Sequence, residues 1–482
     1  MPQRSTEDAL YNLVNHIKGN IEQKKLVTLV SLDIEGAFDS AWWPAIKVRL
    51  AEEKCPVNVR RLLDSYLDCR KIGLRYAGEE HKRYTQKGCV QGSIGGPILW
   101  NLLLDPLLHG LEKQGIYCQA YADDVVMVFS GDTGLETSRQ ANAALNYVQE
   151  WGVQNKLKFA PHKTCAMVLT RKLKYDTPLL RMGGTGIGMS REIKILGLTL
   201  DDKLTFNTHV ARVCKKAADL YKQLSRAAKV SWGLHPEIIR TIYTAVVEPV
   251  ILYAASAWAP AAKKIGTQKA LNAVQRGFAQ KLCKSYRTVS LNSALVLAGI
   301  LPLDLRIQEA AALYEARRGS SRLVLGDREI ERVVGFAESP DGILDSLDEW
   351  NGRYRSGHTA SVTKVFLPDA VDAYRLIRSI KPAGIITQVL TGHGGLSQYL
   401  HRFKCKESPA CICDPDASET VLHVLLDCPV HDRDRFNLEQ QVGIKINLEN
   451  LQTLISSKLT RETFIEYCEK IIIIVNNRNK IV

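Results

Sequence analysis

Three aspartates in the first part of the sequence could hold divalent metal ions. Asp123 and Asp124 are adjacent and precede the apolar run 125–129, and Asp33 ends another apolar run 90 residues earlier. Burying a carboxylate without compensation costs several kcal/mol. Two divalent cations about 3.5–4 Å apart would compensate it, and such a pair lowers the pKa of an attacking hydroxyl and holds leaving phosphates. The three residues therefore predict two-metal phosphoryl-transfer chemistry.

The two adjacent aspartates should not play equal parts. Successive strand residues face opposite sides, so we expect Asp123 at the turn to be a direct ligand and Asp124 to be less tightly engaged. An Asp-Asp pair alone also fits a solvated hairpin turn. Asp33 favours the metal site, and so does the Gly-rich stretch 91–97, which is suited to lie under a nucleotide.

A second group of residues has the spacing of a zinc site. It consists of three cysteines and a histidine, namely Cys411, Cys413, His423 and Cys428. One soft donor pair and one His/Cys pair suit a closed tetrahedral zinc. A single residue between the first two cysteines is a narrow spacing, so another residue could substitute, the alternatives being His401, Cys405 and His431. Unpaired thiols and surface histidines are the other interpretation.

Short periodic segments predict the elements that would position the aspartates. Residues 26–32 form a β-rich strand that delivers Asp33 at its end, and 117–129 form two strands that meet at Asp123 and Asp124. Further strands are expected at 71–77 and 164–170, and helices at 34–51, 56–67, 97–111 and 137–156. Helices separated from an antiparallel-rich sheet predict an α+β fold.

The second half of the sequence is mainly helical and basic. Its helical pattern runs from residue 207 to 399, with interruptions at an acidic connector, 327–349, and at 392–395. Eight Lys/Arg stand between residues 203 and 240, and seven stand between 261 and 290 without an acidic residue. With a net charge of +13, these basic helices predict a polyanionic partner such as a nucleic acid.

The sequence carries no signal of a membrane or secretory protein. Its apolar runs, such as 471–475, are far shorter than the roughly 20 residues of a membrane-spanning helix. The first eight residues lack the apolar core of a signal peptide. Twelve scattered cysteines without a secretory signal indicate a reducing compartment and mostly free thiols.

Five motifs, in order, resemble the palm of reverse transcriptases from non-LTR, LINE-type retrotransposons, particularly the insect elements that insert into ribosomal RNA genes. They are 33–39, 91–104, the Tyr-x-Asp-Asp box 121–124, the group 151–152 with 155 and 161–164, and 195–198, which resembles the primer grip. The stretch 201–302 is similar to the thumb of these proteins and the remainder to their C-terminal segment. The likeness therefore covers nearly the whole chain.

The resemblance implies a role for each residue of the site. Asp33 and Asp123 would ligate Mg²⁺ or Mn²⁺ with assistance from Asp124. Phe38 would exclude a 2′-hydroxyl, and Lys163 would protonate the leaving pyrophosphate. The residues lining the nucleotide and template site would be Gln91, Gly92 and Tyr121. Core packing is the alternative for Phe38, and a solvated loop lysine is the alternative for Lys163.

The implied fold is a right-hand polymerase of the α+β class. Residues 1–25 would be a remnant of the fingers, 26–200 the palm, 201–302 a helical thumb, 303–400 a helical linker, 401–435 a zinc knuckle and 436–482 a helical tail. Because a complete polymerase of this kind has a fingers subdomain before the palm, we expect an N-terminally truncated chain. Its independent activity is for experiment to decide.

The implied function is RNA-directed DNA polymerisation by nucleotidyl transfer. The partners would be an RNA template, a nicked DNA end as primer and target, and deoxynucleoside triphosphates, without a membrane. Synthesis in the cytoplasm and action in the nucleus are expected. One rival is a catalytically inactive nucleic-acid-binding remnant. A second is an intron maturase or an RNA polymerase with the same palm, against which Phe38 and the Cys/His segment argue.

Overall fold

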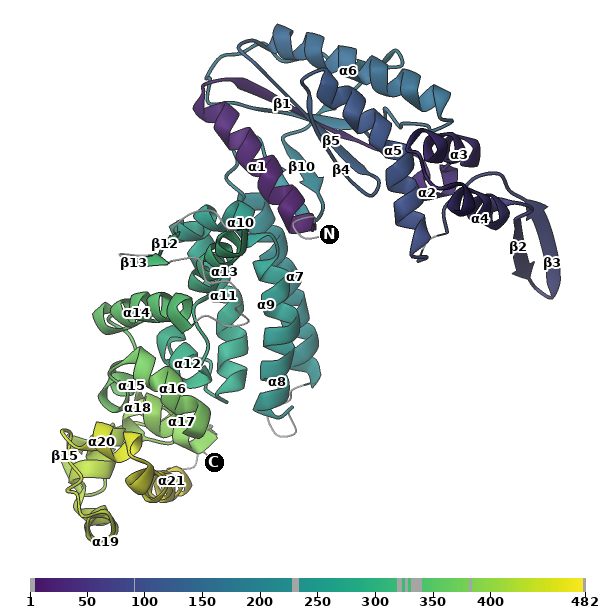
Figure 1. The fold of residues 1–482 in the computed structure, drawn as a ribbon. Coiled ribbons are helices and arrows are strands. Elements are labelled where there is room, and N and C mark those ends of the chain that lie inside the picture. The colour runs from purple at the N-terminus through teal and green to yellow at the C-terminus, as the bar shows by residue number, and fades with distance from the viewer. Residues whose placement is uncertain are drawn as a thin grey trace. The chain divides into compact units, whose positions relative to one another are not determined.

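The computed structural model describes residues 5–90, 92–227, 234–318, 323–325, 328–330, 340–380 and 384–479. The chain divides into two compact units, Met1–His209 and Val210–Val482 (Figure 1). The first unit contains the three aspartates, and the second contains the Cys/His segment. The two candidate sites therefore belong to separate units.

A five-stranded sheet forms the centre of the first unit. Its strand order is β4-β5-β1-β6-β9, with β1 (Leu26–Leu32) in the middle. The other strands are β4 (Tyr117–Tyr121), β5 (Asp124–Gly131), β6 (Cys165–Leu169) and β9 (Gly188–Met189). All neighbours pair antiparallel except β6 and β9. β1 and β5 are apolar and buried almost throughout, which is typical of strands covered on both faces.

Helices cover both faces of this sheet (Figure 1). α5 (Gly95–Lys113) and α6 (Gly134–Gln154) pack on one face, where Leu32, Met127 and Trp100 share one hydrophobic cluster. α1 (Thr6–Glu22) contacts β1 and β4. Its Leu10 lines a small hollow together with Val126, which points away from Met127 because strand residues alternate.

The segment after Asp33 differs from the predicted continuous helix. α2 (Ala37–Ser40) and α3 (Trp43–Glu52) are separate helices. Between them Trp42 forms a β-bridge with Lys87, and Gly88 N donates to Ala41 O at 2.8 Å. This pairing holds the chain extended, and Pro44 then opens α3.

An exposed hairpin follows the predicted helix α4 (Val57–Leu67). β2 (Lys71–Tyr76) pairs with β3 (Glu79–Tyr84), a strand that the sequence did not predict. Both strands are exposed at every position. The sequence of β3 consequently lacks the alternation by which a half-buried strand is recognised.

Two short hairpins complete the first unit. β7 (Arg181–Met182) pairs with β8 (Thr185–Gly186), and β10 (Glu192–Ile195) pairs with β11 (Leu198–Asp201). The turn between β10 and β11 consists of Leu196 and Gly197, with φ of 46° and 88°. The motif that resembles a primer grip thus lies on a tight turn with two positive φ angles.

The second unit is mostly helical. Its first helices are α7 (Asn207–Ala227), α8 (Pro236–Ile242), α9 (Glu248–Leu252), α10 (Ala255–Trp258), α11 (Ile265–Leu282), α12 (Leu291–Ala298) and α13 (Leu303–Arg318). Gln275 is fully buried, and its Nε2 donates to Leu301 O at 2.6 Å while its Oε1 accepts from Leu303 N at 3.1 Å. This amide ties α11 to the start of α13.

Further elements follow in the same unit. They are β12 (Leu323–Leu325), β13 (Arg328–Ile330), α14 (Pro340–Ser356), α15 (Ser361–Phe366), α16 (Ala370–Ile380), α17 (Gly384–Thr391), α18 (Ser397–Arg402), β14 (Ala410–Cys411), β15 (Asp414–Ser418), α19 (Asp432–Val442), α20 (Leu451–Ser456) and α21 (Lys458–Arg478). The predicted acidic connector is not wholly solvated, because α14 begins inside it and buries Leu347.

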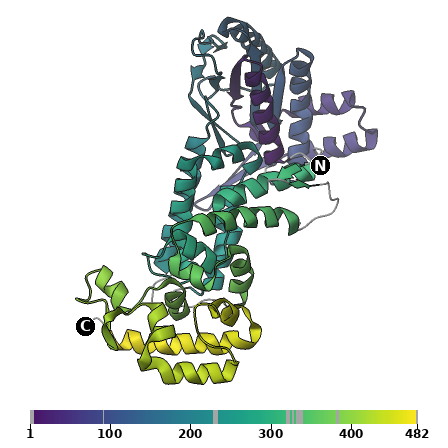
Figure 2. The ribbon, with the colours of Figure 1, turned by 90° about the vertical axis from the view of Figure 1, so that its left-hand side faces the viewer.

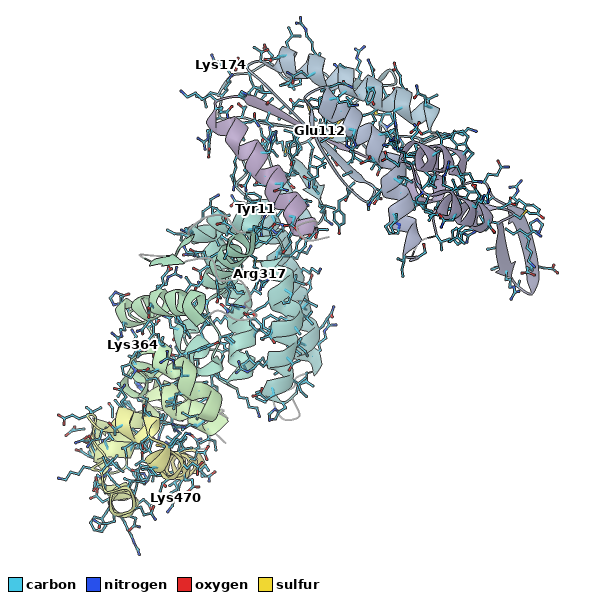
Figure 3. All side chains as sticks on the ribbon, viewed as in Figure 1. Tyr11, Glu112, Lys174, Arg317, Lys364 and Lys470 are labelled. Carbon is cyan, nitrogen blue, oxygen red and sulfur yellow. The ribbon has the colours of Figure 1, made fainter. Side chains whose placement is uncertain are left out.

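The last helix holds the C-terminal elements together. α21, yellow in Figure 2, packs against α17, α19 and α20. Lys470 Nζ on α21, labelled in Figure 3, lies 2.8 Å from Asp434 Oδ1 on α19. Among the described residues, no single helix is long and apolar enough to cross a membrane. The bent pair Pro236–Leu252 and Ala255–Lys263 meets that test only together, by length and composition.

Candidate active site and metal-binding cluster

The β4–β5 turn positions Asp123. Tyr121 pairs with Asp124, so Ala122 and Asp123 form a two-residue turn in which Ala122 has a φ of 54°. The Trp100 indole Nε1 donates to Ala122 O at 2.7 Å, and Trp100 is fully buried. A buried indole needs such an acceptor, and here it fixes the turn that carries the aspartate.

Asp33 lies at the end of the strand next to β5. It directly follows β1, whose last residue, Leu32, pairs with Val125. Ala160 N donates to Asp33 O at 2.9 Å, which anchors the backbone of this residue. Asp33 and Asp124 thus occupy neighbouring strand ends.

The Lys163 side chain faces Asp33. Its Nζ lies 3.6 Å from Asp33 Oδ2, and the two side chains are 59% and 42% exposed. That Oδ2 atom is itself inaccessible to solvent and has no hydrogen-bond partner among the described residues. Since both side chains are largely exposed, solvent screening leaves this pair little effect on stability.

The charges of the other two aspartates act on Asp124. Burial raises the pKa of Asp124, and the charges of Asp123 and Asp33 raise it further. Repulsion of this kind is relieved by a cation, and carboxylates are ligands that Mg²⁺ and Mn²⁺ prefer. The donor set therefore fits these ions, although among the described residues only the Cys/His cluster of the second unit has its ligand atoms gathered as for a metal ion.

Phe38 contacts the residue that fixes the turn. Its ring centroid lies 5.3 Å from that of Trp100, and Phe38 is partly buried against the hydrophobic cluster. Cys89 N donates to Phe38 O at 2.7 Å, which joins α2 to the loop before α5. Phe38 therefore packs against the core and also belongs to the surroundings of the aspartates.

The Gly-rich loop is described in part, because Gln91 lies outside the described residues. Gly92 is exposed with a φ of 81°. A Cβ at Gly96 would lie 2.7 Å from Val90 O, so only glycine fits the loop there without a shift. Ser93 Oγ accepts from Gly96 N at 3.0 Å and closes the loop at the start of α5.

In the second unit, four ligand atoms gather at one point. The ligand atoms of Cys411, Cys413, His423 and Cys428 all lie within 4.8 Å of one another. The two sulfurs of Cys411 and Cys428 are 3.8 Å apart, and Cys413 Sγ is 3.1 Å from His423 Nε2. The donor set and its closeness fit a tetrahedral zinc. The alternatives left open by the sequence lie elsewhere, with His401 and Cys405 exposed outside the cluster.

Backbone contacts position these ligands. Cys413 lies in the two-residue turn of the β14–β15 hairpin, because Cys411 pairs with Asp414. Cys428 O accepts from Arg435 at 3.1 Å, and Leu425 O accepts from the Tyr467 hydroxyl at 2.8 Å. Burial raises the pKa of the Cys428 thiol to about 12, so a thiolate there requires a nearby cation.

Comparison with known proteins gives the family. Residues 1–200 match the family described as reverse transcriptase (RNA-dependent DNA polymerase). A Pol polyprotein of the type-1 retrotransposable element R1 2 from Nasonia vitripennis is 31% identical over 395 residues, which are 80% of this chain and 95% of that protein. The chain belongs to the reverse transcriptase family of non-LTR retrotransposons. The predicted resemblance is confirmed.

Some relatives of this chain are longer. The putative 115 kDa protein of the R1DM element from Drosophila melanogaster is 29% identical over 89% of this chain, which spans 42% of that relative. The chain thus spans less than half of the length of such relatives. An apo telomerase structure from Candida tropicalis has a TM-score of 0.34 and 11% identity, over 64% of this chain and 55% of that one.

The polymerase fold of mixed helix and sheet follows from the family match, while the finer division into subdomains stays a prediction. Sequence reasoning missed Trp100, whose hydrogen bond to Ala122 O fixes the β4–β5 turn. It also missed Leu10 and Leu13 of α1, which line the hollow beside Tyr121 and Asp124. The first of these lies inside the motif 91–104, and that position is the signal that could have pointed to it.

Proposed function

We propose that this chain carries the RNA-directed DNA polymerase module of its retrotransposon. Asp33 and Asp123 would hold Mg²⁺ or Mn²⁺, with Asp124 assisting. The bound ions would lower the pKa of a primer 3′-hydroxyl and stabilise the leaving phosphates. The observation that carries the proposal is the position of the aspartates at two adjacent strand ends, where burial and then the charges of Asp123 and Asp33 raise the pKa of Asp124.

The chain's own residues would serve the remaining needs of the reaction. The 3′-oxygen bonds to the α-phosphorus of the incoming nucleotide, and pyrophosphate leaves. Lys163, whose Nζ lies 3.6 Å from Asp33 Oδ2, would give a proton to that pyrophosphate. Phe38 would exclude a 2′-hydroxyl. The nucleotide and template would be lined by the residues that the motifs contribute, namely Gln91, Gly92 and Tyr121.

The proposed partners are an RNA template, a DNA primer or target and deoxynucleoside triphosphates, with action in the nucleus. A relative supports the chemistry, since the protein of transposon BS from Drosophila melanogaster is named a probable RNA-directed DNA polymerase and is 26% identical over 54% of this chain. We assign 26–200 as palm, 201–302 as thumb, 303–400 as linker, 401–435 as a zinc knuckle and 436–482 as tail. The knuckle would hold zinc through its three cysteines and His423.

Primer extension on an RNA template tests the polymerase proposal. Asp123→Asn should abolish extension and weaken Mn²⁺ binding, because it removes a ligand charge with little change in shape, while nucleic-acid binding should persist. The matched control is Asp132→Asn, an exposed aspartate directly beyond the opposite end of β5. Extension by Asp123→Asn within about tenfold of the parent rate would refute the two-metal assignment.

The same assay distinguishes the polymerase from its rival, an inactive nucleic-acid-binding remnant. A parent chain that binds nucleic acid but neither extends a primer nor binds Mn²⁺ at the aspartates would be the inactive binding remnant. Mn²⁺ binding that depends on Asp123 in a chain without extension would place the deficit outside the metal site.

A further inference from the structure

Four aromatic rings from two distant segments meet on the second unit. Tyr286 follows α11, His393 follows α17, and Tyr399 and Phe403 lie on and directly after α18 (Figure 1). The Tyr399 centroid lies 6.1 Å from that of Tyr286, 4.9 Å from that of His393 and 4.9 Å from that of Phe403. We call these four residues the aromatic platform.

The aromatic platform is both fixed and accessible. The Thr288 and Tyr399 hydroxyls lie 2.8 Å apart, which joins the two segments, and His393 Nδ1 lies 2.8 Å from Thr391 O. Tyr286 and Phe403, at the two ends of the row, are 46% and 44% exposed. Large aromatic side chains at a surface held in one arrangement are suited to receive another flat group.

The surroundings of the aromatic platform are basic. No acidic residue occurs in 249–303 or in 373–406, the two stretches that supply the rings. Exposed basic residues flank the exposed rings, namely Lys284, Arg287, Arg402 and Lys404. The Arg402 guanidinium lies 5.9 Å from the Phe403 centroid. Ser397 N donates to Glu419 Oε1 at 2.9 Å, and this buried carboxylate is paired with Arg478.

Rings beside phosphate-binding cations match one kind of ligand. Every nucleobase has a flat face that stacks on an aromatic side chain, and the phosphates between bases pair with Lys and Arg. In a duplex these faces are already stacked, so the ligand must have unpaired bases. Burial and the nearby Arg402 charge hold the pKa of His393 below its usual value despite hydrogen bonds, so this ring stacks as a neutral imidazole at neutral pH.

We propose that the aromatic platform binds single-stranded nucleic acid, with Tyr286 and Phe403 stacking on unpaired bases and the flanking cations contacting phosphates. RNA and DNA share this chemistry, and the test distinguishes them. The site lies in a different unit from the aspartates, and it does not depend on polymerase activity. It would hold a strand that is displaced from, or not yet paired at, the site of synthesis.

Fluorescence anisotropy with the full chain tests the proposal. The probes are labelled oligouridylate, oligodeoxythymidylate and a DNA duplex of the same length. Tyr286→Ala and Phe403→Ala should each weaken single-strand binding by about 5- to 100-fold, since stacking on one base contributes that much. The matched control is Phe436→Ala, which changes a 58% exposed phenylalanine on α19 of the same unit and should bind like the parent.

Salt dependence adds a second, independent readout. The double change Arg402→Gln and Lys404→Gln should flatten the slope of log affinity against log salt by about 1.4, or 0.7 per phosphate contact on a single strand. The two ring variants should leave that slope unchanged. Loss confined to the uridylate probe would assign the site to RNA, loss confined to the thymidylate probe would assign it to DNA, and both results support the site.

Three results would overturn the aromatic platform as a binding site. They are parent-like affinity of both ring variants, equal weakening of duplex and single-strand binding, and failure of the parent chain to bind either single strand. The first would leave the rings as ordinary packing between α18 and the segments that follow α11 and α17, or as a protein contact.

Discussion

Removal of one ligand from the Cys/His cluster gives the sharpest test of the zinc assignment, because this chain contains the whole cluster. His423→Ala leaves three ligands and an open coordination position. Structural zinc sites in small peptides have apparent binding free energies of about 10–16 kcal/mol. If this free energy is divided equally among the four ligands, the loss of one ligand removes about 3 kcal/mol. Such a loss weakens zinc affinity by roughly a hundredfold.

The assay is zinc content per chain, measured after dialysis against a series of chelator-buffered zinc concentrations. We expect one zinc per parent chain. For His423→Ala, the free zinc concentration at half-occupancy should be higher by about two decades. The matched control is His401→Ala, which changes an exposed histidine outside the cluster and should behave like the parent. A parent without zinc, or equal retention by the two histidine variants, would refute the assignment.

The structure also predicts where chelation loosens the chain. Cys428 and Leu425 stay attached through Arg435 and Tyr467, whereas the β14–β15 hairpin that carries Cys411 and Cys413 is largely exposed. Limited proteolysis with a chelator should therefore cut first within 405–418 and leave the sheet of the first unit intact. Cleavage that begins in the first unit would contradict this coupling.

Three further predictions concern other parts of the chain. Phe38→Ala should raise ribonucleotide relative to deoxynucleotide incorporation without changing base choice, and an unchanged sugar preference would leave Phe38 as a packing partner of Trp100. Burial alone would raise the pKa of Asp369. Hydrogen bonds from the start of α16 and from Asn351, together with the charge of Arg355, outweigh burial and lower that pKa. The stability that the charged Asp369 contributes is present above about pH 4 and is lost as the pH falls through the lowered pKa. Asp369→Asn should therefore lower the free energy of unfolding in urea by about 1–2 kcal/mol at pH 7 and by less at pH 3. An equal loss at both pH values would contradict a role for the carboxylate charge. Three exposed lysines should contact the phosphates of a duplex, namely Lys263, Lys264 and Lys269. Neutralising all three should reduce the slope of log affinity against log salt by roughly two to three if each touches a phosphate, and an unchanged slope would exclude that contact.

The sequence predicted the elements around the aspartates well because their signals are local. The strand 26–32 and the two strands that meet at Asp123 and Asp124 are apolar runs interrupted by charge, and they correspond to β1, β4 and β5. The proximity of Asp33 to Asp124 was inferred from a motif order. It arises physically from antiparallel pairing of Leu32 with Val125.

Other features depend on partners that a single sequence does not display. The break between α2 and α3 exists because the segment at Trp42 pairs with Lys87, a contact between distant parts of the chain. α1 is different, since its signal was present. Ser5 and Asp8 form a capping box, and the buried Leu10, Leu13 and Ile17 recur at helical spacing. Assigning 1–25 only as a remnant of the fingers left that pattern unused.

The position of β1 in its sheet has a consequence during synthesis on the ribosome. β1 is complete at Leu32, yet its two neighbours end at Gly131 and Leu169. The 137 residues between Leu32 and Leu169 take roughly 7 to 27 s to translate at about 5–20 residues per second. Both hydrogen-bonding edges of this apolar strand are unpaired until β5 is complete at Gly131, and the edge that pairs with β6 stays unpaired for the whole of that time. A segment of this kind aggregates or recruits a chaperone. Slower translation of 33–169 would lengthen that exposure, and a nascent chain stalled before Leu169 should bind a holdase that releases it once β6 has emerged.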